Sequence, residues 1–180
     1  SSYSLVRNWT ITPILPFHQD GEVENINISS PLPLGLEMYG LIPPNPIQTE
    51  SGGSHTCFIA DEILKCFGRN QNGQLGLGDS TDRNTSQTVD FGANRTVVSV
   101  STGDSHTCAI LDNGSLNCWG YNNLGQLGIG SSVPQITPQF VDLGTGRTAD
   151  SVSLGNHHTC AILDDGSLKC WGDNLDGQLG

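Results

Sequence analysis

Positively charged residues are scarce in this sequence of 180 residues. It holds 7 Lys and Arg against 18 Asp and Glu, which gives a formal net charge of −11. Proteins that bind nucleic acid gain affinity by neutralising phosphates with clustered Lys and Arg. Seven scattered cations cannot do this, so the composition excludes nucleic acid as a partner and disfavours an anionic membrane surface.

Long apolar runs and helix-forming residues are also scarce. No run approaches the roughly 20 apolar residues of a membrane-spanning helix, so no membrane insertion is predicted. The sequence opens Ser1-Ser2 without a signal-like segment, and any signal peptide is expected to have been removed. Ala, Lys, Glu and Met are few, whereas Thr, Val, Ser and 23 Gly are plentiful. This composition predicts an all-β fold of short strands and tight turns.

The second part of the sequence is a repeat with a period of about 52 residues. A Gly-x-x-His-Thr-Cys motif, the tetrapeptide Gly-Gln-Leu-Gly and a linking Thr-x-Gln-x-Val-Asp stretch recur in order. The Cys motif ends at Cys57, Cys108 and Cys160, and the tetrapeptide ends at Gly76, Gly128 and Gly180. A period near 50 built from short strands and glycine turns is typical of β-propeller blades.

These motifs resemble the regulator-of-chromosome-condensation repeat, in which Gly-x-x-His-Thr and a hairpin precede Trp-Gly-x-Asn-x-x-Gly-Gln-Leu-Gly. The resemblance implies propeller blades, seven of them in a complete ring. It covers residues 51–180, divided as 51–76 (partial), 77–128 and 129–180. Because about two and a half repeats are fewer than the four to eight blades of closed propellers, further repeats or neighbouring copies are expected to supply the missing contacts.

The six cysteines lie in hairpins whose register follows from the turn residues. In the second copy, a three-residue loop at residues 112–114 places Cys108 opposite Cys118, with Gly114 in the left-handed position of the turn. The third copy places Cys160 opposite Cys170 in the same way. In the first copy a two-residue loop, Asp61-Glu62, places Cys57 opposite Cys66 and Ile59 opposite Leu64.

Directly opposed cysteines are close enough to bridge, so we predict three disulfides within the hairpins. Zinc is the alternative, because His55, His106 and His158 lie near the pairs; free buried thiols are another. Structural zinc sites favour Cys-x₂₋₄-Cys spacing, whereas these pairs are nine or ten residues apart. Disulfides predict an oxidising location, extracellular or on the cell surface.

Other residues have architectural and functional interpretations. Sequons for N-glycosylation occur at Asn8, Asn27, Asn84, Asn94 and Asn113. Asn84 and Asn94 lie in connecting stretches, whereas Asn113 has a structural role in its turn. Asp173 to Gly177 resembles the start of a calcium loop, but the other copies lack the carboxylates, so the shared Asn and Gly are expected to serve the turn.

The repeating His is expected to form structural hydrogen bonds, and Phe67, Trp119 and Trp171 are expected to pack between sheets. An enzyme needs a convergent set of different polar residues, whereas these are copied from blade to blade. His157 beside His158 is the only catalytic candidate. The sequence therefore predicts a non-enzymatic protein, with no cofactor and no metal.

The first fifty residues share none of the repeat and hold seven of the nine Pro. We interpret residues 1–50 as an extended Pro-rich arm or a partial β module. Four apolar residues alternate as in a strand that could complete a sheet in another subunit: Tyr3, Leu5, Trp9 and Ile11.

Taken together, these features predict an extracellular structural or adhesive protein that assembles with copies of itself, as a subunit of a surface fibre or filament. The alternative is a soluble secreted propeller that recognises another extracellular protein.

Overall fold

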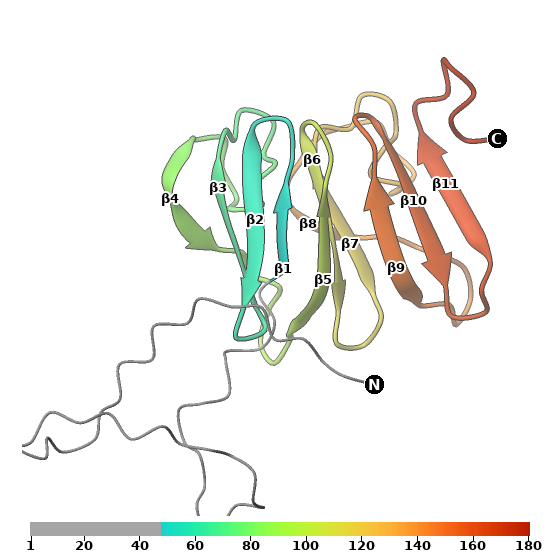
Figure 1. Ribbon diagram of the computed structural model, residues 1–180, viewed down its shortest axis with the longest axis horizontal. Helices are drawn as coiled ribbons and strands as arrows, with labels where there is room; N and C mark the ends of the chain where they lie inside the picture. Colours follow the sequence, from blue (N-terminus) through green and yellow to red (C-terminus); the bar gives the residue numbers. More distant parts are fainter. Residues whose placement is uncertain (1–47) are drawn as a thin grey trace, which may run out of the picture. The chain divides into compact units, whose positions relative to one another are not determined.

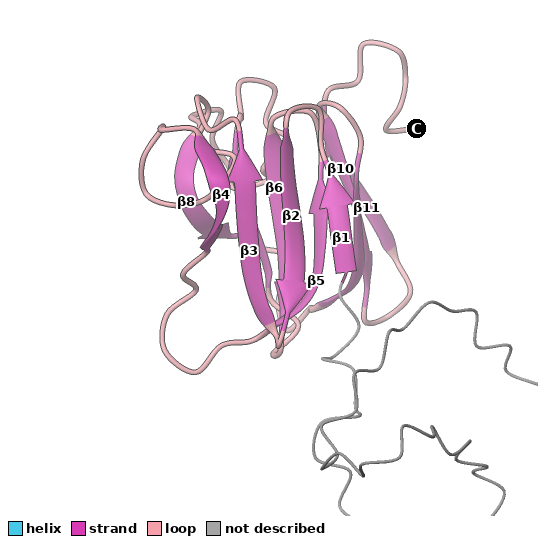
Figure 2. Cartoon of the chain, turned by 60° about the vertical axis from the view of Figure 1, so that its left-hand side comes forward, coloured by secondary structure: helices cyan, strands magenta, loops and turns pink. Residues whose placement is uncertain are grey.

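The computed structural model describes residues 48–180, which contain strands, turns and loops but no helix (Figure 2). Accordingly, no helix in this part of the chain is long and apolar enough to cross a membrane. Eleven strands form three antiparallel sheets that stand side by side (Figure 1). The all-β prediction is confirmed.

The first two sheets have four strands each, joined in sequence order. The first sheet comprises β1 (Gln48–Ser51), β2 (His55–Ala60), β3 (Ile63–Gly68) and β4 (Arg83–Thr88). The second comprises β5 (Val97–Thr102), β6 (His106–Leu111), β7 (Leu116–Gly120) and β8 (Gln135–Phe140). The third has three strands, β9 (Ala149–Leu154), β10 (His158–Leu163) and β11 (Leu168–Gly172). Each sheet is one propeller blade.

The hairpin registers predicted from the turns are confirmed. Cys57 pairs with Cys66 across β2 and β3, and Cys108 pairs with Cys118 across β6 and β7. Gly114 has a φ of 75°, as its turn requires. The two residues of the shorter loop, Asp61 and Glu62, have φ values of 51° and 63°. Both are left-handed, as in a type I′ turn, whose twist matches that of the flanking strands.

Each pair of neighbouring sheets encloses its own hydrophobic core. The first core joins Leu64 and Leu75 of the first repeat to Val100, Leu111 and Trp119 of the second, and all but Leu111 are nearly inaccessible to solvent. The second core joins the second and third sheets in the same way. The chain is thus held together blade to blade, as in repeat proteins whose units cannot bury their apolar faces alone.

The sheets are out of phase with the sequence repeats. The repeat boundaries after residues 76 and 128 fall between β3 and β4 and between β7 and β8, within sheets. The boundary after residue 50 falls inside β1. The strand that opens each sheet precedes the Gly-x-x-His motif. The copies in β5 and β9 share Ser-Val-Ser at residues 99–101 and 151–153, whereas β1 lacks this sequence.

Candidate functional site

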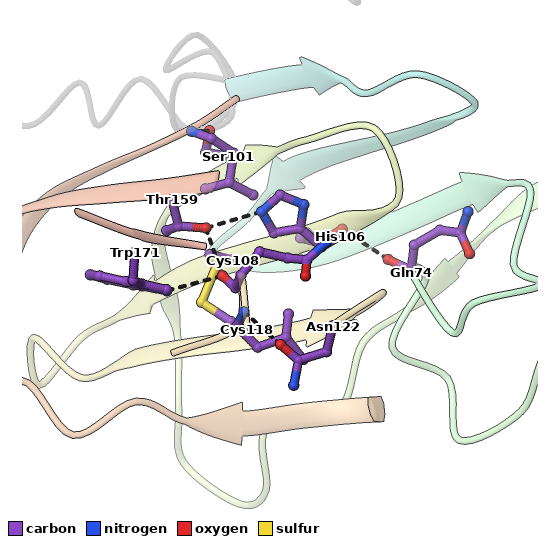
Figure 3. The surroundings of a disulfide bond; sticks show 12 residues. Gln74, Ser101, His106, Cys108, Cys118, Asn122, Thr159 and Trp171 are labelled. Carbon is purple, nitrogen blue, oxygen red and sulfur yellow. Dashed lines mark hydrogen bonds between the residues drawn. A yellow bond between two sulfur atoms is a disulfide. The ribbon is translucent and has the colours of Figure 1, made fainter. Parts of the chain in front are cut away.

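The predicted disulfides are formed: Cys57–Cys66, Cys108–Cys118 and Cys160–Cys170, each with a Cα–Cα distance of 4.1 Å. The first two lie on the face of their sheet that looks toward the following sheet, which places the second disulfide among the inter-sheet residues of Figure 3. Since all six thiols are used, the histidines have no thiolate partner with which to bind zinc.

Three side chains and one main-chain carbonyl lock the first sheet to the second. His55 Nε2 lies 2.8 Å from Thr107 Oγ1, and that hydroxyl donates to the main-chain carbonyl oxygen of Gln74 at 2.9 Å. The indole N–H of Trp119 donates to the same carbonyl at 3.0 Å. We call this set the His–Thr–Gln–Trp relay. His and Gln come from one repeat, and Thr and Trp come from the next.

The relay recurs without change between the second and third sheets (Figure 3). His106 Nε2 lies 3.0 Å from Thr159 Oγ1, and Thr159 donates to the carbonyl oxygen of Gln126 at 2.9 Å. The Trp171 indole donates to that oxygen at 3.0 Å. The structural role predicted for the repeating His is confirmed for His55 and His106, and the predicted inter-sheet packing is confirmed for Trp119 and Trp171.

The relay fixes the protonation state of its histidines. The single hydroxyl proton of Thr107 is donated to Gln74, so its oxygen must accept a proton from His55 Nε2. The same holds for Thr159 and His106. Nδ1 of both rings is buried and has no hydrogen-bond partner within the described residues. A second proton there would be a buried charge without an acceptor, which is costly.

Burial accordingly lowers the pKa of both histidines. The pKa of His55 falls to about 4, mainly through burial and against the attraction of the Asp104 carboxylate. The pKa of His106 falls to about 3 through burial and through repulsion from the neighbouring histidines. Both rings are neutral at physiological pH, and these two histidines are suited to holding sheets together rather than to acid–base chemistry.

The glycine of each Gly-x-x-His turn lies directly against the His ring. A Cβ on Gly103 would overlap with Cε1 of His106 and lie 2.6 Å from the carbonyl oxygen of Gly155 in the next sheet. Gly103 is also bonded to the neighbouring turn, because its carbonyl accepts from Gly53 N–H at 3.2 Å. No other residue fits at this position.

We therefore expect Gly103→Ala to lower the free energy of unfolding by about 3 kcal/mol through overpacking. Gly53→Ala is the control, since the nearest atom to its new Cβ is the carboxylate of the exposed Asp104, which can turn away. It should cost less than about 1 kcal/mol, as surface changes do. Urea denaturation of both variants measures the difference in the free energy of unfolding. Equal losses in the two variants would contradict the steric conflict at Gly103.

In the first sheet, Phe67 occupies the position equivalent to Trp119. We expect Trp119→Phe to keep an aromatic ring in place while it removes the donor to Gln74, which still accepts from Thr107, and part of the buried indole volume. The cost should be about 2 kcal/mol, from one hydrogen bond and a small cavity. Trp119→Ala removes the packing too and should cost about 3–5 kcal/mol. Thermal unfolding of the two variants tests whether packing dominates.

The Asn of each repeat closes the loop that follows the Trp-Gly or Phe-Gly pair. Asn70 and Asn122 are fully buried and accept, through Oδ1, from the N–H of Leu75 and Leu127 at 2.9 and 3.0 Å. Asn174 does the same for Leu179 at 2.9 Å. The shared Asn therefore serves the turn. Within residues 48–180 no group of three or more His, Cys, Asp or Glu is arranged to hold a metal ion.

One end of the sheets carries side chains that differ from blade to blade. At this end, which we call the loop end, the residue after each Trp-Gly or Phe-Gly pair donates its N–H to the residue before the repeating His. The pairs are Arg69–Ser54, Tyr121–Ser105 and Asp173–His157, at 2.9, 2.8 and 3.0 Å. The backbone is thus the same in each blade, while the side chains presented on it vary.

The loop end combines aromatic, apolar and acidic groups. The rings of Tyr121 and His157 lie 6.0 Å apart across two blades. Leu124 is 43% exposed and Leu175 is 88% exposed in the adjacent loops, and the Asp104 carboxylate is also exposed. Sequence reasoning missed this surface because it followed the residues that repeat. The positions that could have indicated it lie between the repeating residues, where the sequences of the copies differ.

Three of the predicted glycosylation sites lie in the described residues. Asn84 is exposed on β4, and Asn94 is exposed in the loop before β5. Asn113 is exposed, and its Oδ1 accepts from the N–H of Ser115, which gives it the structural role expected from its turn. The remaining sequons, Asn8 and Asn27, lie outside the described residues, as do the strand-like residues Tyr3, Leu5, Trp9 and Ile11.

Comparison with known proteins identifies the repeat. Residues 66–110 and 113–162 match one model described as the regulator of chromosome condensation (RCC1) repeat, and residues 97–126 and 149–178 match a second. The chain is 32% identical over 165 residues to the Ultraviolet-B receptor UVR8 of Arabidopsis thaliana, covering 91% of this chain and 37% of the receptor. It is 34% identical over 137 residues to the mouse X-linked retinitis pigmentosa GTPase regulator, covering 75% of this chain and 14% of the regulator.

Solved structures agree on the fold. Prp20p from Saccharomyces cerevisiae, whose crystal structure was described together with its binding to Gsp1p and histones, superimposes with a TM-score of 0.64. The sequences are 24% identical, and the match covers 74% of this chain and 34% of Prp20p. The chain thus spans little more than a third of the length of each of these relatives, or less.

Proposed function

Because the chain belongs to the regulator of chromosome condensation (RCC1) repeat family, we propose that it is a non-enzymatic propeller-repeat protein that binds another protein through its loop end. The observation that carries this proposal is a fixed backbone with side chains that differ from blade to blade. Aromatic groups with apolar and polar neighbours are typical of protein recognition surfaces. Tyr121, His157, Leu124 and Leu175 supply this combination at the loop end.

The net charge of the chain favours a protein over a nucleic acid as its partner. With a net charge of −11, the chain is not suited to a nucleic acid. A cavity beside the Asp61-Glu62 turn lies at the end opposite the loop end.

The disulfides support an extracellular or cell-surface location, since such bonds persist in oxidising compartments. Glycosylation follows from the same location, and Asn84 and Asn94 are accessible for it. When the chain is expressed in a eukaryotic secretory pathway, Asn84→Gln should remove one glycan-dependent step in gel mobility. Treatment with an N-glycosidase should abolish the remaining difference between the proteins. Identical mobility of the wild type before and after the glycosidase would contradict glycosylation at these sites.

Capture of partners by matched variants tests the binding proposal. The loop-end variant combines Tyr121→Ser, Leu124→Ser and Leu175→Ser. The control carries Asp112→Ser and Asp164→Ser in hairpin turns at the other end, where both carboxylates are exposed. We expect a partner retained by the wild type and by the control to be lost from the loop-end variant, by at least tenfold in affinity. A partner lost only from the control would move the binding site to the hairpin end.

A further inference from the structure

The hairpin turn between β6 and β7 carries an exposed Asn-Gly pair. Asn113 is exposed at its tip, and Gly114 follows in the left-handed conformation. The second sheet packs against the first on one face and against the third on the other, and the Asn113 side chain is exposed in the presence of both. Among Asn-x pairs, Asn-Gly loses its side-chain amide most readily, because glycine has no side chain to shield its backbone nitrogen.

We propose that Asn113 is a site of spontaneous deamidation and that its aspartate product pairs with Arg95. The backbone nitrogen of Gly114 attacks Cγ of Asn113, the Cγ–Nδ2 bond breaks, and the Gly114 proton leaves with the side-chain nitrogen as ammonia. Water then opens the five-membered imide. Cleavage of the new Cγ–N bond gives aspartate, whereas cleavage at the main-chain carbonyl gives isoaspartate, whose backbone is one carbon longer. The reaction needs no oxidant and no co-reactant other than water.

The third sheet shows that the turn accepts an aspartate at this position. Asp165 is equivalent to Asn113, and the other residues of the turn, 163–168, are identical to those of 111–116. Asn113 Oδ1 accepts from the N–H of Ser115 at 3.1 Å, and Asp165 Oδ1 accepts from the N–H of Ser167 at 3.0 Å. A carboxylate can therefore replace the amide and keep the hydrogen bond that shapes the turn.

The third sheet also shows what the new carboxylate would contact. Arg147, which precedes β9, pairs with two carboxylates of the turn, Asp164 at 3.2 Å and Asp165 at 3.1 Å. Within residues 48–180, Arg95 at the equivalent place before β5 pairs with Asp112 alone, at 3.4 Å. Deamidation in the second sheet would supply the second carboxylate and complete the same ion-pair network.

A second Asn-Gly pair provides an internal control, and the sequence contains no third. Asn72-Gly73 forms the same kind of turn, since Gly73 donates its N–H to the carbonyl oxygen of Asn70, three residues back, as Gly114 does in its own turn. Asn72 is half-buried, however, and Gly73 is buried, so that a Cβ on Gly73 would lie 2.7 Å from Cα of Ile136 in the second sheet. Forming the imide changes the backbone around the pair, which this packed loop resists.

Peptide mapping of the full chain by mass spectrometry tests the reaction. The chain is made in a bacterial periplasm, where disulfides form and no glycan blocks the amide of Asn113, and is then held in its native state at mildly alkaline pH. We expect aspartyl and isoaspartyl peptides to accumulate at Asn113 at least about tenfold faster than at Asn72, because the packed loop must first open. Equal rates at the two sites, or no conversion at Asn113, would overturn the proposal.

The ion pair is tested separately with a variant that carries the carboxylate from the start. At low ionic strength we expect Asn113→Asp to raise the midpoint of urea unfolding above that of the freshly purified wild type. In an Arg95→Gln background the same change should lower the midpoint, because the new carboxylate then lies beside Asp112 without a cation. A shift in the same direction in both backgrounds would contradict pairing with Arg95. Neither test depends on a partner at the loop end, so this proposal and the binding proposal can fail separately.

Discussion

Reduction of the three disulfides is expected to lower the free energy of unfolding by about 6–9 kcal/mol. Each bond closes a loop of 9 or 10 residues. In the chain-entropy model such a loop contributes roughly 2–3 kcal/mol, because the cross-link restricts the unfolded chain. The bonds lie in three separate sheets, so their contributions should be nearly additive. This sum is comparable with the whole stability of a typical domain, about 5–15 kcal/mol.

Denaturation with and without a reductant measures this effect. The reduced and alkylated chain should be largely unfolded at room temperature, as judged by near-UV circular dichroism from Trp119 and Trp171. A graded control comes from removing one bond at a time as paired Cys→Ala variants. Removing Cys108–Cys118, which is fully buried between sheets, should cost more than removing Cys160–Cys170, whose cysteines are only half-buried. Unfolding midpoints that do not move on reduction would contradict the bracing role.

Acidification from pH 7.5 to pH 5 is expected to remove about 4 kcal/mol of stability, about 2 kcal/mol for each buried histidine. In the unfolded chain both histidines take up protons near pH 6.5, whereas in the folded chain the pKa falls to about 4 for His55 and about 3 for His106. The unfolded state therefore binds more protons below pH 6.5, and stability falls as the pH drops from there toward the folded pKa values.

Urea unfolding at a series of pH values, with His106→Gln beside the wild type, isolates the contribution of one ring. Glutamine can still donate to Thr159, so the variant should fold, and its loss of stability between pH 7.5 and 5 should be about half that of the wild type. The pKa values of Asp79 and Asp165 lie below their usual 3.8, so these two carboxylates stay ionised throughout this pH range. A wild-type stability that is flat over this range would contradict the neutral, buried relay.

Local features were predictable from the sequence, and contacts between sheets were not. The turn lengths set the register of each hairpin, so Cys57 opposite Cys66 followed from counting residues. The repetition of His, Thr, Gln and Trp showed that they belong to the architecture. It did not show that His55 meets Thr107, 52 residues away, or that Trp119 meets Gln74, 45 residues away. Those contacts depend on how one sheet packs on the next.

The loop-end residues could not be recognised in the sequence for a related reason. Tyr121 and His157 lie 36 residues apart in the chain and come together only because neighbouring blades place their loops side by side. A pattern search favours residues that recur, and these do not. In this fold the recurring residues hold the blades together, and the positions that differ between copies are free to take part in recognition.

Non-reducing peptide mapping by mass spectrometry is the most direct test of the central claim, that disulfide-braced blades are locked together by repeated contacts. Free thiols in the native protein are alkylated first, and the chain is then digested without reductant. The account predicts three linkages, Cys57–Cys66, Cys108–Cys118 and Cys160–Cys170, and no alkylated cysteine. Alkylated cysteines, or linkages between different repeats, would contradict both the braced hairpins and the oxidising location inferred from them.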